Sequence, residues 1–178
     1  QVQSSAGGAL RADATLLTPA TQAFGIWSVI YVGLVGYVIW QWLPAQTHSR
    51  TARDTGWWAA GSLLLNGAWL GVTQAGWLWV SVLVIALLAY VLGRLCLNLV
   101  GHGPHSLAEL LVVYVTFGLY LGWVCVATVA NVTAAAVGTG VRLGAAERIV
   151  AVIVLLVAGA LGVFLSRRMP GQYAIGVA

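Results

Sequence analysis

The chain has 178 residues, of which 61% are apolar and only 7% are charged, with a formal net charge of +4. A water-soluble domain carries about a quarter of its residues as Asp, Glu, Lys or Arg, so this composition excludes a soluble enzyme. The arginines are scattered rather than clustered, which excludes a nucleic-acid-binding surface. Because backbone polar groups inside lipid must be satisfied internally, we expect an all-α polytopic transmembrane helical bundle.

Five segments are apolar and long enough to cross a membrane, which takes about 20 residues. We expect one transmembrane domain over residues 1–178, with complete spans at residues 23–43, 56–74, 77–99, 107–137 and 147–166. The fourth segment exceeds one straight crossing, so its ends should protrude or the helix should tilt. The apolar stretch 171–178 is too short to cross and is interpreted as the start of a truncated sixth span.

Short signals mark several of these boundaries. Thr18 before Pro19 is typical of a helix start, and Pro44 should close the first span. Ser106 and Glu109 have the spacing of a capping box at the start of the fourth span. Almost no residues separate the second and third spans, which predicts a tight antiparallel hairpin.

Arginine placement indicates the orientation of the bundle. One side of the predicted membrane holds five arginines, and the other holds three. The five are Arg50, Arg53, Arg94, Arg167 and Arg168; the three are Arg11, Arg142 and Arg148. We therefore expect the five-arginine side to lie in the cytoplasm. The expected location is the bacterial inner (plasma) membrane, with membrane lipids around the integral protein.

Tryptophans and glycines suggest how the bundle meets lipid and packs. An interfacial aromatic belt is predicted at the two ends of the bundle. It comprises Trp40, Trp42, Trp57 and Trp58 at one end and Trp77 and Trp79 at the other. The small-xxx-small patterns beginning at Gly67 and Gly118 are interpreted as packing within the bundle, with a homodimer interface as the alternative.

Three predicted spans each carry a face that combines aromatic rings with amides or small residues. Helical spacing groups Phe24, Trp27 and Tyr31 on the first span, Asn66 and Trp69 on the second, and Trp123, Ala127 and Asn131 on the fourth. One hypothesis is a pocket for a flat, mostly apolar ligand with the amides orienting it. The alternative is that the amides hold helices together. No catalytic residue, metal site or required cofactor is predicted.

These same faces carry a resemblance to a known family. The segment from Thr18 through Phe24, Trp27 and Tyr31, the Asn66-x-x-Trp69 motif, and the run from Tyr120 to Asn131 occur in one order. In that order they resemble the signature motifs of the translocator (TspO/MBR) family of tryptophan-rich sensory proteins. The first helix of the family is missing here and the chain extends past the fifth, which resembles a longer, divergent branch.

The resemblance implies a membrane sensor or carrier that binds a flat lipophilic small molecule, a tetrapyrrole such as porphyrin or haem, or a sterol or isoprenoid. The ligand-binding set it implies is Phe24, Trp27, Tyr31, Asn66, Trp69, Trp123, Ala127 and Asn131. Porphyrin degradation also follows from the resemblance, so enzymatic activity stays open. The alternative function is a non-catalytic structural or accessory subunit of a larger membrane complex.

Overall fold

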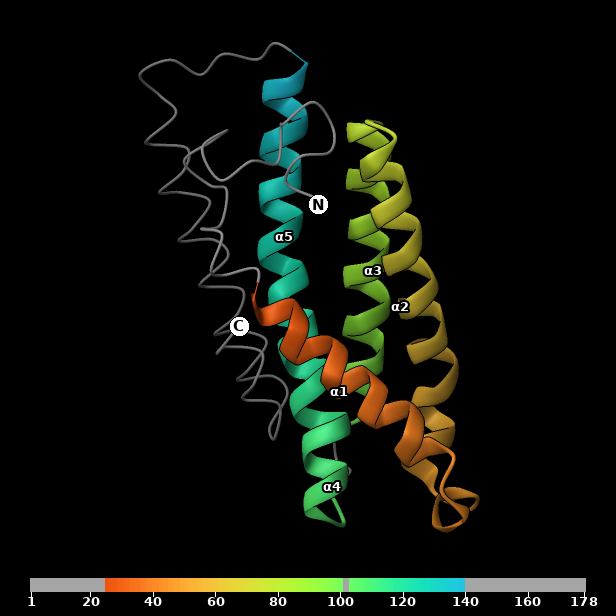
Figure 1. The fold of residues 1–178 in the computed structure, drawn as a ribbon. Coiled ribbons are helices and arrows are strands. Elements are labelled where there is room, and N and C mark those ends of the chain that lie inside the picture. The colour runs from red at the N-terminus through yellow and green to blue at the C-terminus, as the bar shows by residue number, and fades with distance from the viewer. Residues whose placement is uncertain (1–24, 101–102, 140–178) are drawn as a thin grey trace.

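The computed structural model describes residues 25–100 and 103–139, and the regular elements within those ranges are all helical (Figure 1). They are α1 (Ile26–Gln41), the short 3-10 helix η4 (Pro44–Gln46), α2 (Arg50–Gln74), α3 (Leu78–Asn98), α4 (Leu107–Glu109), the π-helical segment η5 (Leu110–Val115) and α5 (Thr116–Gly138). The all-α prediction is confirmed for these residues. The predicted span 147–166, the segment 171–178 and the helix start at Thr18 lie outside them.

Helix α3 lies between α2 and α5, and α1 crosses obliquely over η5 and the first part of α5 (Figure 1). The interior between α3 and α5 is built from fully buried leucines and aromatic rings, among them Leu88, Leu92 and Leu95 on α3 and Phe117 and Tyr120 on α5. Lipid tails are as apolar as these side chains, so close packing and interhelical hydrogen bonds hold such helices together within a membrane.

Two of the described helices are long and apolar enough to cross a membrane. They are α3, with 21 residues, and the continuous helix Leu107–Gly138, with 32. At 1.5 Å per residue the latter measures about 48 Å, well beyond a hydrocarbon core of about 30 Å. Its length agrees with the expectation that its ends protrude or that it tilts. Helix α1 is also apolar, but its 16 residues reach only about 24 Å.

The hairpin of α2 and α3 forms as predicted. Helix α2 ends at Gln74 and α3 begins at Leu78, and the turn passes through Gly76, whose φ of 77° favours glycine. Helix α2 starts six residues earlier than the predicted span because Ser49 caps it. The Ser49 hydroxyl accepts a hydrogen bond from the Ala52 backbone N–H at 3.3 Å.

The capping box at the start of α4 is also present, in a shifted form. The Ser106 hydroxyl accepts from the Glu109 N–H at 3.1 Å, and the Glu109 carboxylate accepts from the His105 N–H at 2.9 Å. In the usual arrangement the carboxylate accepts from the capping residue itself. The π-helical segment that follows was not predicted, and the Thr116 hydroxyl donates to the Leu111 carbonyl there at 2.9 Å.

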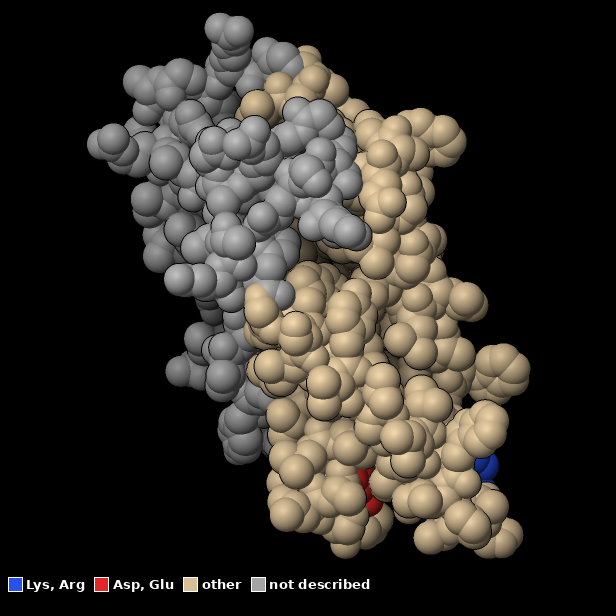
Figure 2. Space-filling view, in the orientation of Figure 1, with Lys and Arg blue, Asp and Glu red and all other residues tan. Residues whose placement is uncertain are grey.

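Among residues 25–100 and 103–139, the charged side chains gather at one end of the bundle. Figure 2 shows a face whose described part is almost entirely uncharged, with the visible basic and acidic atoms near the end where α2 and α4 begin. Trp42 and Trp57 project from this end and are 84% and 89% exposed, as a belt requires. Trp40 is an exception: it is buried and stacks on Tyr37 at 6.0 Å, so its belt assignment is wrong.

Gly67 and Gly71 do not pack within the bundle as we had expected. A Cβ built on either glycine meets nothing within 4 Å, and both positions are exposed on α2. The other pair differs, because Gly118 and Gly122 are buried in α5.

Candidate functional site

An aromatic cluster forms where the first turn of α1 crosses between α2 and α5. The indole of Trp27 lies at its centre and stacks on Tyr31 at 5.4 Å and on Trp69 at 6.2 Å, with interplanar angles of 20° and 23°. It meets Tyr120 and Trp123 edge to face, at 6.0 and 6.4 Å. Offset-stacked and edge-to-face pairs at these separations stabilise one another. The cluster therefore ties α1, α2 and α5 together.

Asn66 lies beside this cluster and joins α2 to α1. Its amide Nδ2 donates to the Tyr31 hydroxyl at 3.1 Å. Its carbonyl Oδ1 is buried and has no hydrogen-bond partner among the described residues. An unsatisfied buried polar group costs about 1–3 kcal/mol, so this oxygen favours an additional donor.

The polar edge continues along the same face of α2. Trp69 Nε1 and Thr73 Oγ1 are also buried without a hydrogen-bond partner in the described structure. With Asn66 they occupy positions i, i+3 and i+7, which share one side of a helix. This side of α2 thus offers an acceptor, a donor and a hydroxyl in a line beside stacked rings.

On α5, Asn131 lies two turns beyond Trp123 and faces α3. Its Oδ1 accepts a hydrogen bond from the Ser81 hydroxyl at 3.2 Å, while its Nδ2 is buried with no hydrogen-bond partner among the described residues. Ala127, between them, is half-buried and packs against the core. The structure therefore places Asn131 at the α3–α5 contact, and neither Asn131 nor Ala127 is among the residues of the aromatic cluster.

Comparison with known proteins bears on what this arrangement is. A family model for TSPO-like proteins matches residues 2–176, nearly the whole chain. The chain belongs to the TSPO-like family. No curated protein and no solved structure gave a significant match. The family resemblance drawn from the sequence motifs is confirmed, and membership indicates a ligand-binding protein of a membrane.

For this TSPO-like chain, the structure brings together part of the ligand-binding set predicted from the sequence. Trp27, Tyr31, Trp69 and Trp123 meet in one cluster, and Asn66 touches it through Tyr31. Phe24 lies outside the described residues.

The predicted ligand-binding set left out Tyr120 and Thr73, although the sequence places Thr73 one turn beyond Trp69 on the same face and Tyr120 at the start of a family motif. Tyr120 packs edge to face on Trp27, and its hydroxyl lies 3.5 Å from the Ser62 carbonyl. Both residues had a usable signal in their spacing, because Tyr120 precedes Trp123 by three positions and Thr73 follows Trp69 by four.

The cluster presents aromatic faces and hydrogen-bonding groups. The described residues that form it have aromatic, amide, hydroxyl and small side chains. Within residues 25–100 and 103–139 no three His, Cys, Asp or Glu side chains gather into a group that would hold a metal ion. What these residues offer a ligand is ring stacking and a few oriented hydrogen bonds.

Proposed function

We propose that this TSPO-like protein is a sensor or carrier of the bacterial plasma membrane that binds a flat lipophilic molecule, with a tetrapyrrole such as protoporphyrin or haem as the favoured class. The binding face would comprise Phe24, Trp27, Tyr31, Asn66, Trp69, Trp123, Ala127 and Asn131. Sterols and isoprenoids share the apolar, extended character that the rings suit.

One observation carries the proposal: buried polar atoms without a described partner lie next to stacked rings. Asn66 Oδ1 and Trp69 Nε1 supply one acceptor and one donor beside the Trp27 stack. A tetrapyrrole has wide apolar faces for the rings and polar groups at its centre and edge. Binding it would satisfy these atoms, whereas the packing among the described helices leaves them without a partner.

Fluorescence quenching tests the proposal directly. We expect protoporphyrin IX to quench tryptophan emission of the detergent-solubilised protein in a saturable way. The variant combining Asn66→Ala with Trp123→Ala should bind at least tenfold more weakly. Trp42→Phe, which removes an exposed indole at the far end of α1, is the matched control and should keep the affinity. Unchanged affinity in the double variant would refute the site.

Two further measurements separate the alternatives. A protein that co-purifies stoichiometrically in mild detergent, together with absent ligand binding, would favour the accessory-subunit function. Porphyrin degradation would show as absorbance of illuminated protoporphyrin decaying faster with protein than in a detergent control.

A further inference from the structure

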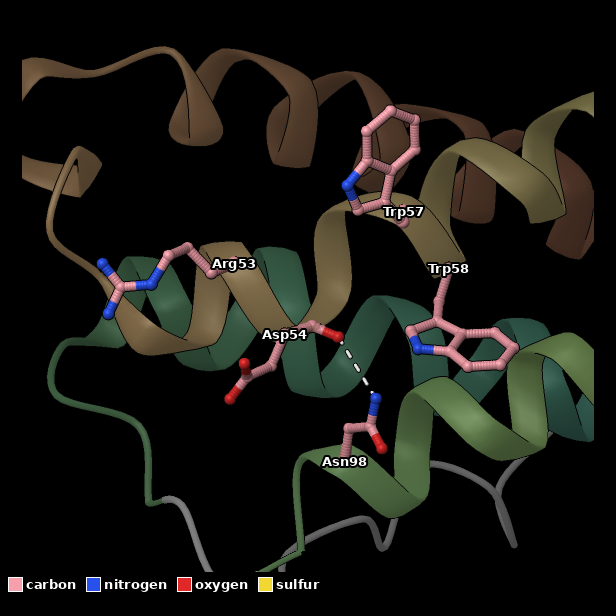
Figure 3. Close-up of a pocket in the computed structure, with 5 residues that line it drawn as sticks. All are labelled: Arg53, Asp54, Trp57, Trp58 and Asn98. Atoms are coloured by element: carbon pink, nitrogen blue, oxygen red, sulfur yellow. Dashed lines mark hydrogen bonds between the residues drawn. The ribbon is translucent and has the colours of Figure 1, made fainter.

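A pocket lies at the end of the α2–α3 hairpin opposite Gly76, away from the aromatic cluster. It has a volume of about 380 Å³, opens at the protein surface, and is lined by Arg53, Asp54, Trp57, Trp58 and Asn98 (Figure 3). At about 30 Å³ per water molecule, the pocket has room for about a dozen water molecules. We propose that this pocket binds the headgroup of phosphatidylethanolamine, with the phosphate at Arg53 and the ammonium at Asp54.

The arginine on the pocket wall, Arg53, forms no ion pair within the described structure, and Arg50 lies one turn before it, outside the pocket. Arg50 and Arg53 lie in the first turns of α2, where the helix dipole is positive, and the first turn has no acidic residue. Neither arginine forms an ion pair with another described residue. A guanidinium favours phosphate oxygens through paired, charge-assisted hydrogen bonds. A phosphate beside Arg53 would therefore be stabilised by both the side chain and the helix end.

The acidic side of the pocket also lacks an ion pair among the described residues. The Asp54 carboxylate forms no ion pair with a described residue. Asn98 Nδ2 donates to the Asp54 backbone carbonyl at 3.2 Å, which leaves Asn98 Oδ1 as an acceptor on the pocket wall (Figure 3). A carboxylate and an amide oxygen together suit a group with several N–H donors and a positive charge.

Phosphoethanolamine is the lipid headgroup that matches both sides of the pocket. Its phosphate is anionic and its primary ammonium has three N–H donors. Phosphoglycerol carries no positive charge for Asp54, and choline has no N–H to donate. Aromatic faces often bind quaternary ammonium groups, but the Trp58 ring already carries the Arg94 guanidinium at 5.9 Å from its centroid.

The surroundings of the pocket suit a lipid rather than a soluble zwitterion. Trp57 is 89% exposed beside it, and large apolar side chains continue along the outer surface of the hairpin. These are Leu64 on α2 and Leu83, Leu87, Tyr90 and Leu97 on α3. Indole rings favour the depth of lipid headgroups, so acyl chains of a bound lipid would run along this apolar surface.

Lipid competition tests the assignment. The protein is placed in nanodiscs with equal amounts of phosphatidylethanolamine, phosphatidylcholine and phosphatidylglycerol bearing identical acyl chains. It is then extracted in mild detergent, and the retained lipids are counted by native mass spectrometry. We expect phosphatidylethanolamine to be enriched at least fivefold over each competitor. Retention in the bulk ratio, or enrichment of phosphatidylglycerol, would overturn the proposal.

Variants locate the site. Asp54→Asn should abolish the preference over phosphatidylglycerol, Asp54→Glu should keep it, and Arg53→Gln should lower retention of all three lipids. Arg50→Gln, one turn earlier and outside the pocket, is the matched control and should behave as wild type. A persisting preference in Asp54→Asn would contradict the assignment. Protoporphyrin affinity, measured in the same variants, should not change, so this site and the aromatic site stand or fall separately.

Discussion

Asn131 joins two helices through one atom of its amide and leaves the other atom without a described partner. Its Oδ1 accepts from Ser81 across the α3–α5 contact, and its Nδ2 is buried without a described partner. Ser81 also donates to the Leu78 carbonyl at 2.7 Å, so its hydroxyl keeps a local partner when Asn131 is replaced. Hydrogen bonds between membrane helices average only about 0.6 kcal/mol. The helix contact alone therefore depends little on the amide.

From this contact we predict that Asn131→Leu leaves thermal unfolding in detergent nearly unchanged while protoporphyrin affinity falls about tenfold, equivalent to about 1.4 kcal/mol. Ser81→Ala is the matched control, because it removes the same interhelical hydrogen bond but keeps the amide, and its affinity should equal that of wild type. An Asn131→Leu protein that unfolds early yet binds normally would show that Asn131 only joins helices.

Trp40 shows what the belt prediction overlooked at the residue scale. The tryptophans that flank the loop between the first two spans were predicted to lie at the lipid interface. The high exposure of the Trp42 and Trp57 side chains agrees with that prediction. Trp40, however, continues the buried face of α1 formed by Ile30, Leu34 and Tyr37. Helical spacing overrides nearness to a loop, because a residue three positions after Tyr37 points the same way.

At the scale of helices, the crossing of α1 over η5 depends on two glycines. A Cβ at Gly33 would lie 2.7 Å from Thr116 Cγ2 and 3.0 Å from its Cβ, and a Cβ at Gly36 would lie 3.1 Å from Val112 Cγ1. The first contact is too short for a real side chain, so α1 lies this close to the start of α5 because Gly33 has none.

Gly33→Ala should therefore destabilise the protein by roughly 1–3 kcal/mol, the usual cost of overpacking. The measurement is thermal unfolding in detergent, analysed as a double-mutant cycle with Thr116→Ala, which removes the clashing atoms and should recover much of the loss. Gly67→Ala is the control, since a Cβ there meets nothing and helix propensity favours alanine. Equal effects at Gly33 and Gly67 would rule out the close crossing.

Helix boundaries that carry a local sequence signal could be predicted, whereas the π-helical segment η5 could not. Ser106 and Glu109 placed the start of α4, and the near-absence of residues between two apolar runs placed the α2–α3 hairpin. Nothing in residues 110–115 distinguishes a π-helical turn from an α-helical one, because both show the same apolar run. In the structure the Thr116 hydroxyl donates to the Leu111 carbonyl in this turn, and α1 packs against it, neither of which sequence periodicity describes. Likewise, Asn131 meets Ser81 through the packing of two helices fifty residues apart.

Over the whole molecule, the arginines of the described helices gather at one end. Arg50 and Arg53 begin α2, and Arg94 lies in the last turn but one of α3, so the hairpin presents all three on the side opposite Gly76. Positive charge near short loops favours the cytoplasmic side. The charged end should face the cytoplasm and the Gly76 turn the other side.

Cysteine labelling checks this orientation in intact cells. In a background where the free cysteines Cys96 and Cys125 are replaced by Ala, Ala75→Cys should react with a membrane-impermeant maleimide. Thr47→Cys, in the loop before α2, should react only after the cells are permeabilised. The reverse pattern would invert the orientation.

The three residues 75–77 also join α2 to α3 during biosynthesis. Three residues reach at most about 10 Å, far less than the thickness of the membrane. The end of α2 therefore stays close to the start of α3 on the same side of the membrane. Helix α3 is apolar enough to partition into lipid, whereas α2 does not reach the same apolarity. We therefore expect the more polar helix α2 to enter the membrane together with α3, as one unit. In that case only the uncharged turn around Gly76 would cross, and Arg50, Arg53 and Arg94 would stay on the cytoplasmic side.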